Sequence, residues 1–379
     1  MTGTFTPGTD TLTADILEKV RAGLDDGGLD AIVATSPENV AYTSGAAPPS
    51  QRTVRSRIAA AVVPRVGATE VIAVALEGPV VRAQSRLDTI TLYQEFAEDP
   101  VEVIAASLKA RGLGDGVIGV EETHLTAASY RKLEAALPGA RLVPVDDLLA
   151  ALRMIKAPAE VERICRIGKA AEEIARDCCA AFGPGATERE LGNFIAERYA
   201  AAGGDGLTML VVGSGPRSAA VNAPPTDRVL EPEDVVRLDV IGTAGHYYSD
   251  VARTAVVGEP TREQQDVYDL LLGVHRRALE ALRPGVLTTD VYAIYREAMD
   301  AAGLPPYHFV GHGLGITLHE DPFVNDLKPT PLEPGMVLCI EPLTLLEGRF
   351  GMQIEDEVLI TANGCELITE AGDLLRIGG

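Results

Sequence analysis

A short segment in the last fifth of the chain holds two histidines framed by glycines. It runs from Gly311 to Glu320, and its histidines, His312 and His319, are two of only six in 379 residues. Imidazole is a common metal ligand, and it is the side chain whose ordinary pKa lies nearest to neutral pH. Glycine lets the backbone approach a bound ion or substrate closely. The segment therefore predicts a site of metal binding or proton transfer.

Four acidic residues elsewhere lie within or at the end of apolar runs that are typical of β-strands. They are Asp239, Asp250, Glu341 and Glu355. A carboxylate buried in such a strand is costly unless it is paired or bound to a metal ion. Taken one at a time, each acid is more simply explained by a surface or capping role. Together with His312 they form a set of oxygen and imidazole ligands large enough to hold two divalent ions.

The hydrophobic pattern also predicts how these acids are brought together. Residues 235–241 and 247–257 have the composition of strands, and Gly245 lies in a turn between them. A hairpin at this point would place Asp239 and Asp250 on neighbouring strands.

The segment 352–360 is predicted to be one continuous strand. Strand alternation then places Gln353, Glu355 and Glu357 on one face and Asp356 on the other. Under this prediction the ligand candidate Glu355 shares its face with Gln353.

The elements that must position these residues fall into two groups. In the first, helices and strands alternate, which predicts a mostly parallel or mixed sheet covered by helices. Its predicted elements are, in order, 12–24, 30–35, 58–63, 70–75, 101–111 and 117–120.

The second group follows a junction at residues 152–158, and in it a pair of helices precedes strands twice. The first pair is predicted over 158–182 and 188–201, with Thr187 and Glu190 at the spacing of a capping box. A similar pair follows residue 261. The order of elements indicates two related half-domains, although no residue-level repeat is visible.

The composition excludes several classes of function. The net charge of −22 opposes binding to nucleic acid phosphates, and no tryptophan is present to stack on bases. No run approaches the roughly 18 apolar residues of a membrane span. Residues 1–10 lack the pattern of a secretion signal, and the five cysteines form no CxxC pair. We expect a cytoplasmic protein with reduced thiols that binds neither membrane nor nucleic acid.

The ordered set Asp239, Asp250, His312, Glu341 and Glu355 resembles the five-ligand pattern of the pita-bread metallopeptidases. This superfamily includes methionine aminopeptidases, Xaa-Pro aminopeptidases and prolidases, with creatinase as a relative that uses no metal. The supporting motifs are residues 248–254, 311–315, 319–322, 333–337 and 340–342.

The front of the chain is similar to the creatinase-type N-terminal domain, through residues 36–45 and the 153–160 junction. The resemblance therefore implies an α/β creatinase-like domain over residues 1–152. An α+β pita-bread catalytic domain with two related halves would follow over 153–379. The front domain favours the prolidase and Xaa-Pro aminopeptidase branch.

The resemblance implies a role for each ligand. Asp239 would hold one ion, and Asp250 and Glu355 would bridge two ions. His312 and Glu341 would complete the shell of the second ion. Glu341 is also the expected general base.

The resemblance extends to two further histidines. His319 would donate a hydrogen bond to the developing oxyanion or the substrate amide, and His308 would contact the substrate beyond the scissile bond. Both are therefore expected to be catalytic and substrate-binding residues. The other three histidines match no motif, and we expect structural roles for them; they are His124, His246 and His275.

Three positions depart from the family pattern. Asn222 stands where many members have a histidine near the substrate, and asparagine cannot supply a proton at neutral pH. Gln353 stands where proline-specific members usually carry an arginine, and Ile241 stands where glycine is commoner. The metal ligands thus match the family while the substrate-binding residues, in which we include Asn222 and Gln353, are altered.

The sequence predicts a dinuclear-metal hydrolase that cleaves the amide bond of a small peptide, of the Xaa-Pro dipeptidase or Xaa-Pro aminopeptidase type. Manganese is the expected ion, with cobalt, zinc or iron as alternatives, and the resemblance implies a homodimer. Two other readings stay open. One is an amidase acting on a small non-peptide molecule, as in creatinase-type relatives; the other is a protein that keeps the fold but has lost catalysis. The sequence does not fix the native substrate or metal.

Overall fold

The computed structural model of the chain describes residues 11–378, which form two compact units. One unit ends at Arg153 and the other continues from Met154, so the break lies in the predicted junction. Residues 1–10, where the sequence shows no secretion signal, lie outside the described residues. Across the described part of the chain, no helix combines the length and the apolar character that a membrane crossing requires.

The first unit is built around a six-stranded mixed sheet with the order β4-β3-β2-β1-β5-β6. β2 runs antiparallel to β1 and β3, and the other neighbours are parallel. Apolar side chains of β1, β2, β3 and β5 pack against α4 and α5, as the predicted alternation requires. The elements are α1 (Thr11–Asp26), β1 (Ala31–Ala34), α2 (Pro37–Ser44), β2 (Ala60–Pro64), β3 (Glu70–Val74), η1 (Ala75–Glu77), α3 (Gly78–Gln84), β4 (Thr89–Tyr93), α4 (Pro100–Ala110), β5 (Val117–Val120), α5 (Ala127–Ala136), β6 (Arg141–Pro144) and α6 (Asp146–Met154).

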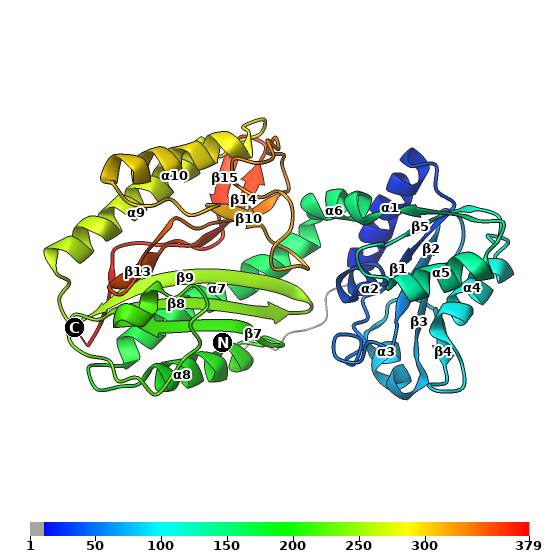
Figure 1. The fold of residues 1–379 in the computed structure, drawn as a ribbon, viewed down its shortest axis with the longest axis horizontal. Coiled ribbons are helices and arrows are strands. Elements are labelled where there is room, and N and C mark those ends of the chain that lie inside the picture. Colours follow the sequence, from blue (N-terminus) through cyan, green and yellow to red (C-terminus); the bar gives the residue numbers. More distant parts are fainter. Residues whose placement is uncertain (1–10, 379) are drawn as a thin grey trace. The chain divides into compact units, whose positions relative to one another are not determined.

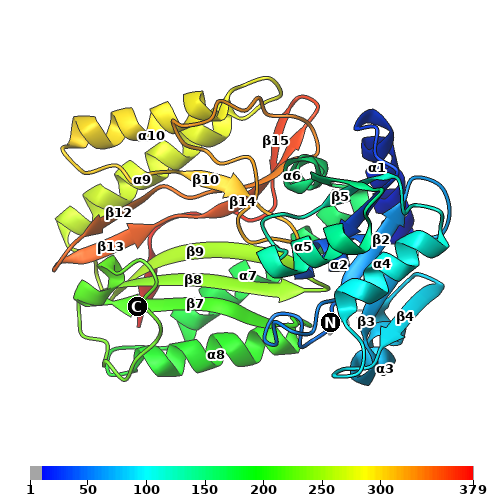
Figure 2. The ribbon, with the colours of Figure 1, turned by 45° about the vertical axis from the view of Figure 1, so that its right-hand side comes forward.

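The second unit holds two four-stranded sheets, β16-β9-β8-β7 and β10-β11-β14-β15, and a two-stranded sheet, β12-β13. Figures 1 and 2 show α7 and α8 along the sheet of β7, β8 and β9, with α9 and α10 beside the strands that follow. The elements are α7 (Pro158–Ala181), α8 (Glu188–Ala201), β7 (Gly206–Ser214), η2 (Gly215–Ala219), β8 (Val235–Ala244), β9 (Tyr247–Val257), α9 (Arg262–Ala281), α10 (Thr288–Ala302), β10 (Gly311–Gly313), β11 (Val337–Ile340), β12 (Leu343–Leu346), β13 (Phe350–Gln353), β14 (Asp356–Thr361), β15 (Gly364–Leu367) and β16 (Leu375–Ile377).

The two predicted halves of this unit have matching starts and separate cores. Thr187 and Glu190 form the predicted capping box of α8, and Thr261 and Gln264 form an equivalent box at α9. In each box the first side chain accepts from the backbone of the second and the second accepts in return, which satisfies two free N–H groups. One apolar core joins α7 and α8 to β7, β8 and β9, and another joins α9 and α10 to β11, β13 and β14. The predicted α+β unit with two related halves is confirmed.

The strand predicted over 352–360 is interrupted, although Gln353 and Glu355 share a face as predicted, since the Gln353 amide donates to Glu355. β13 ends at Gln353 and β14 begins at Asp356, so Glu355 lies in the break between them. The segment that pairs with β13 and β14 is interrupted at the same level, because β11 ends before Glu341 and β12 begins after Pro342. Proline has no N–H to give to a ladder, so regular pairing cannot continue across this level. The same register holds on both sides of the break, so Glu341 and Glu355 lie opposite one another.

Candidate metal centre and active site

The first two acids are carried by the β8–β9 hairpin, as predicted. Asp239 lies opposite Ala252 and Asp250 lies opposite Ile241, so the two acids are diagonal neighbours on one face of the sheet. The turn residues Gly245 and His246 both have positive φ, 55° and 74°, the pattern of a tight hairpin turn that follows the twist of the strands. Both acids are buried.

His312 enters from β10 and is completely buried. Its Nδ1 donates to the carbonyl oxygen of Gly313 at 3.0 Å. Nε2 is then the unprotonated nitrogen, whose lone pair can bind a metal ion. Nε2 lies 3.3 Å from Glu341 Oε1 and 3.6 Å from Asp250 Oδ2. It also lies 3.9 Å from Glu355 Oε1. The imidazole predicted from the glycine-framed segment therefore meets acids from three other strands or strand ends.

The framing glycines serve a different purpose from the one that the sequence suggests. A Cβ on Gly311 would lie 2.3 Å from the carbonyl oxygen of Cys339, and one on Gly313 would lie 2.5 Å from that of Asp321. Such distances are far below van der Waals contact, so a side chain would push neighbouring backbone apart. The glycines let chain segments approach each other around His312 rather than exposing backbone to a ligand.

One atom of each predicted ligand is buried without a hydrogen-bond partner among the described residues. These atoms are Asp239 Oδ1, Asp250 Oδ1, His312 Nε2, Glu341 Oε1 and Glu355 Oε1. Buried polar atoms are nearly always satisfied, and five orphaned acceptors side by side would be costly in a protein that binds nothing there. A carboxylate-rich set with one imidazole fits divalent cations such as Mn²⁺ or Zn²⁺.

The electrostatics of the acids support the same fit. Burial raises the pKa of Asp250 and of Glu355 well above ordinary carboxyl values, and repulsion from the neighbouring acids adds to the effect. Burial also raises the pKa of Asp239, against the opposing charge of Arg237. A bound cation would reverse this balance, because it stabilises the ionised carboxylates directly.

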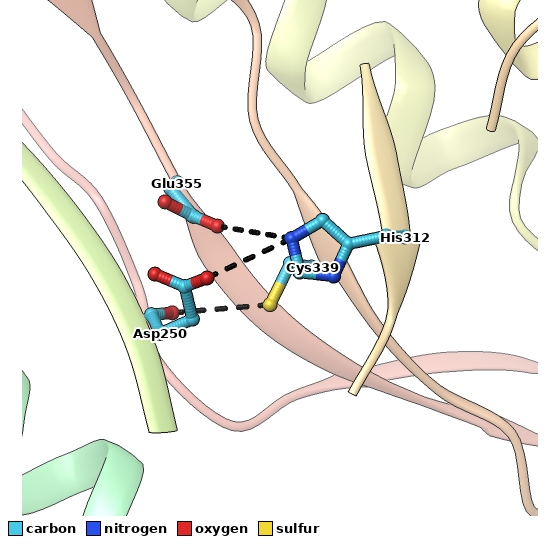
Figure 3. Close-up of side chains that lie close together, drawn as sticks. All are labelled: Asp250, His312, Cys339 and Glu355. Atoms are coloured by element: carbon cyan, nitrogen blue, oxygen red, sulfur yellow. Dashed lines mark hydrogen bonds and ion pairs between the residues drawn. The ribbon is translucent and has the colours of Figure 1, made fainter. Parts of the chain in front are cut away.

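Cys339 is a neighbour of the centre that sequence analysis did not select. Figure 3 shows its thiol beside Asp250, His312 and Glu355, and one donor atom from each of the four residues lies within 4.8 Å of the others. Its Sγ donates to the backbone oxygen of Asp250 at 3.9 Å. Burial raises the pKa of the thiol well above its usual value, which disfavours the thiolate form that binds metals. All five cysteines are free thiols, as predicted.

A cavity of about 240 Å³ opens beside the acids. Three of the predicted substrate-binding residues line it: Asn222, His319 and Gln353. The other lining residues are Met209, Val221, Arg237, Asp239, Ile241, Asp250, Tyr307, Phe309, Leu318, Glu341, Leu343, Leu345 and Glu355. His312 is not among the lining residues.

His319 stacks on His312, with ring centroids 3.9 Å apart. Although the side chain of His319 remains partly open to solvent, desolvation lowers its pKa to about 4, and the neighbouring imidazole of His312 adds to the shift. His308 lies elsewhere. Its side chain is exposed, its ring contacts that of Tyr307 at 5.6 Å, and it is not among the residues that line the cavity. The structure thus brings together four of the five predicted metal ligands and His319 at the cavity, but not His308.

The remaining histidines stay outside the cavity, as expected. His246 forms the hairpin turn, and His124 Nδ1 lies 3.3 Å from Thr35 Oγ1 in the first unit. His275 is buried, and its Nε2 lies 3.3 Å from Asp356 Oδ2.

Gln353 and Arg237 form a contact that sequence analysis missed. The guanidinium of Arg237 donates to Gln353 Oε1 at 2.8 Å, and the Gln353 amide donates to Glu341 and Glu355. Arg237 was visible in the sequence as a basic residue inside an apolar strand, two positions before Asp239. Its pairing with a residue from a distant strand was not.

Comparison with known proteins agrees with this geometry. Residues 161–362 match metallopeptidase family M24, and residues 16–155 match the creatinase/prolidase N-terminal domain. A probable dipeptidase, PepE, of Mycobacterium tuberculosis is 32% identical over 348 residues, covering 90% of each chain. The Xaa-Pro dipeptidase of Pyrococcus furiosus is 29% identical over 359 residues, covering 93% of this chain and 97% of that one.

The solved structures give the same answer for the fold. The dipeptidase PepE from Mycobacterium ulcerans superposes with a TM-score of 0.84 at 30% identity, over 99% of this chain and 100% of that one. The family match, the relatives and the five assembled ligand residues all indicate one kind of enzyme. The chain belongs to metallopeptidase family M24 and is a metallopeptidase with a creatinase/prolidase N-terminal domain.

Proposed function

We propose that this metallopeptidase uses two divalent ions to hydrolyse the peptide bond of very short peptides, as an Xaa-Pro dipeptidase or Xaa-Pro aminopeptidase. The observation that carries the proposal is the set of five orphaned ligand atoms beside a small cavity. At about 240 Å³ the cavity is smaller than the roughly 300–1,000 Å³ of pockets for drug-sized ligands. A dipeptide suits this volume better than a long peptide does. The names of the relatives in Mycobacterium tuberculosis and Pyrococcus furiosus point the same way.

The ligands divide between two ions as the family resemblance implies. Asp239 would hold one ion, Asp250 and Glu355 would be shared by both ions, and His312 and Glu341 would complete the set of ligands around the second ion. Bound divalent ions supply Lewis-acid activation of the scissile carbonyl and of the attacking water. Carboxylate oxygens outnumber the single imidazole, which favours manganese among the candidate metals.

Glu341 would act as the general base. Its Oε2 accepts from Gln353 at 3.2 Å, while Oε1 has no partner among the described residues and the side chain lines the cavity. A carboxylate so placed beside the cavity can take a proton from water and return it to the leaving amine. The hydrogen bond from Gln353 would keep the Glu341 carboxylate in one orientation during this proton transfer.

His319 would donate a ring N–H to the substrate carbonyl, because it lines the cavity and its ring is held against that of His312. Asn222, which also lines the cavity, would donate or accept a hydrogen bond but cannot supply a proton. His308 would meet only those parts of a substrate that extend past Tyr307 and Phe309. A homodimer remains a sequence-based expectation.

The second candidate is hydrolysis of a small non-peptide amide. Two observations favour it: the small cavity, and Asn222 where a histidine would offer a proton. Both activities would use the same metal ligands and the same base, so the substrate decides between them.

The deciding experiment is a substrate panel with metal-stripped protein reconstituted with Mn²⁺, Co²⁺ or Zn²⁺. Dipeptides with and without a C-terminal proline, Xaa-Pro-Xaa tripeptides and small non-peptide amides would be assayed in parallel. We expect the highest kcat/KM on a dipeptide, with Glu341→Gln as the inactive control. Turnover confined to non-peptide amides would replace the proposal with the second candidate.

A further inference from the structure

Arg237 is a buried cation that the proposed chemistry does not yet use. It lies on β8, is 2% exposed and lines the cavity. Its Nε donates to the carbonyl oxygen of Ser218 at 3.0 Å, and its Nη2 donates to those of Ala220 and Val221. Its Nη1 donates to Gln353 Oε1 at 2.8 Å. Among residues 11–378 it forms no ion pair with a carboxylate.

The contact with Arg237 fixes the orientation of the Gln353 amide. A guanidinium has donors and no acceptor, so the atom of Gln353 that faces it must be the carbonyl oxygen. The amide nitrogen is thereby turned towards the metal ligands. It donates to Glu341 Oε2 at 3.2 Å and to Glu355 Oε2 at 3.1 Å. One side chain thus holds one oxygen of each of two ligands.

The other oxygen of each glutamate is the one that faces the centre. Glu341 Oε1 and Glu355 Oε1 are both buried and unpartnered among the described residues, and both lie within 4 Å of His312 Nε2. If the amide were flipped, Gln353 would present an acceptor to two carboxylates and would no longer hold them. The guanidinium therefore determines which oxygens are free for a cation.

We propose that Arg237 and Gln353 form a positioning pair that fixes Glu341 and Glu355 for metal binding, with Arg237 acting through Gln353. The inference rests on the proposed metal centre but not on the identity of the substrate. Side chains that hydrogen-bond to metal ligands orient them, and their loss typically costs about 10- to 100-fold in metal affinity or activity. The guanidinium that proline-specific relatives would carry at position 353 is here delivered to that position from β8.

The contacts distinguish this role from direct binding of a substrate carboxylate. The guanidinium has five N–H groups, and the protein's own acceptors take one from Nε, one from Nη1 and two from Nη2. One N–H remains, which is too few for the bidentate grip with which arginine holds carboxylates. The three backbone carbonyls instead anchor η2 and the residues that follow it, so the guanidinium is fixed when it meets Gln353.

The test is a double-mutant cycle on metal affinity. Gln353→Met removes both amide contacts with the glutamates and leaves the bonds of Arg237 to the backbone intact. Arg237→Met removes the guanidinium. Metal-stripped proteins would be titrated with Mn²⁺ by calorimetry, and with Co²⁺ while the visible spectrum reports the ligand geometry. We expect each single variant to lose about 10- to 100-fold in affinity for at least one ion. The double variant should lose no more than the worse single variant, because both act on one contact.

Arg228→Met is the matched control. Arg228 is a partly buried arginine that pairs with Asp234 Oδ2 at 2.5 Å and contacts no metal ligand. Its loss should lower thermal stability without changing Mn²⁺ affinity or the Co²⁺ spectrum. Gln353→Glu provides a second variant, since it keeps an acceptor for Arg237 but offers no donor to the glutamates, and it should lose affinity as Gln353→Met does.

Two outcomes would overturn the proposal. Wild-type affinity and spectrum in Gln353→Met would show that the amide does not position the ligands. Losses that add in the double variant would show that Arg237 acts independently of Gln353. If Arg237→Met does not fold, Gln353→Met and Gln353→Glu still decide whether the amide positions the ligands. Arg237→Lys, alone and combined with Gln353→Met, then decides whether Arg237 acts independently of Gln353. Wild-type protein that binds metal but cleaves no peptide would refute the proposed function and leave this pair standing.

Discussion

The proposed metal centre and the proposed substrate-facing wall of the same cavity are built differently. All five candidate ligand side chains are buried and come from strands or from the break between paired strands. On the wall, Asn222 and His319 are exposed and belong to loops, and His308 is exposed outside the cavity. Rigid strands hold a constellation of ligands more accurately than loops do, and loops tolerate replacement. Under the proposed function, residues on strands determine the kind of reaction, and residues on loops determine which substrate is accepted.

The departures from the family pattern follow this division. Asn222 lies on a loop of the wall, while no ligand residue is replaced. Gln353 lies between the two regions, because it ends β13 and contacts two ligands while also lining the cavity. Gln353 is therefore linked directly to the proposed metal centre, through its bonds to Glu341 and Glu355, rather than to the loops alone.

The largest expected effect is that of Glu341→Gln, which removes both a ligand oxygen and the general base. A positioned general base contributes about 10²- to 10⁴-fold to rate, so kcat should fall by at least this range. Steady-state kinetics with metal analysis in parallel would measure it. A variant that kept its metal and more than a tenth of the wild-type kcat would contradict the assigned role.

The next effect is that of His319→Ala on the wall. Loss of a hydrogen-bond donor to a developing oxyanion typically costs about 10²- to 10³-fold in kcat. KM and Mn²⁺ affinity should change little, because His319 stacks on a ligand but is not one. If the change appeared in KM alone, His319 would bind the ground state of the substrate instead.

A smaller effect is expected from crowding the strands that hold the ligands. In Gly311→Ala the new Cβ would meet the carbonyl oxygen of Cys339 at 2.3 Å. Overpacking of this kind typically costs about 1–3 kcal/mol, to be measured as the free energy of unfolding in urea. Gly273→Ala is the matched control, since nothing lies within 4 Å of its Cβ and alanine favours helix α9. Equal stability of the two variants would show that β10 and β11 can separate without cost.

The smallest effects should come from the exposed wall. Asn222→Ala should lower transition-state stabilisation, measured from kcat/KM, by about 0.5–1.5 kcal/mol, the value of one neutral hydrogen bond.

His308→Ala should leave dipeptide turnover unchanged, because His308 is not among the cavity-lining residues. If His308→Ala lowered kcat/KM as much as Glu341→Gln does, exposed loop residues would matter as much as the buried ligands, and the proposed difference between the two regions would be wrong.

The candidate ligands could be selected from the sequence because their chemistry is local. A carboxylate in an apolar strand is visible without knowledge of the fold, and so is the hairpin around Gly245. Thr187 and Glu190 likewise mark a helix start through their spacing alone.

What sequence analysis missed depends on pairing between distant segments. The break at Glu355 follows from Pro342 on the opposite strand, and the position of Cys339 follows from its register opposite His312. The contact between Arg237 and Gln353 joins residues 116 positions apart. His308 matched a motif, yet it is exposed and is not among the cavity-lining residues, because motif spacing does not determine where a loop side chain lies.

The most direct test of the central claim is the activity of metal-stripped protein as Mn²⁺ is added back, with the bound metal counted per chain. The five orphaned ligand atoms predict that hydrolysis of an Xaa-Pro dipeptide rises with added metal and reaches its maximum at two ions per chain. Full activity with one ion per chain, or with none, would contradict the two-metal account.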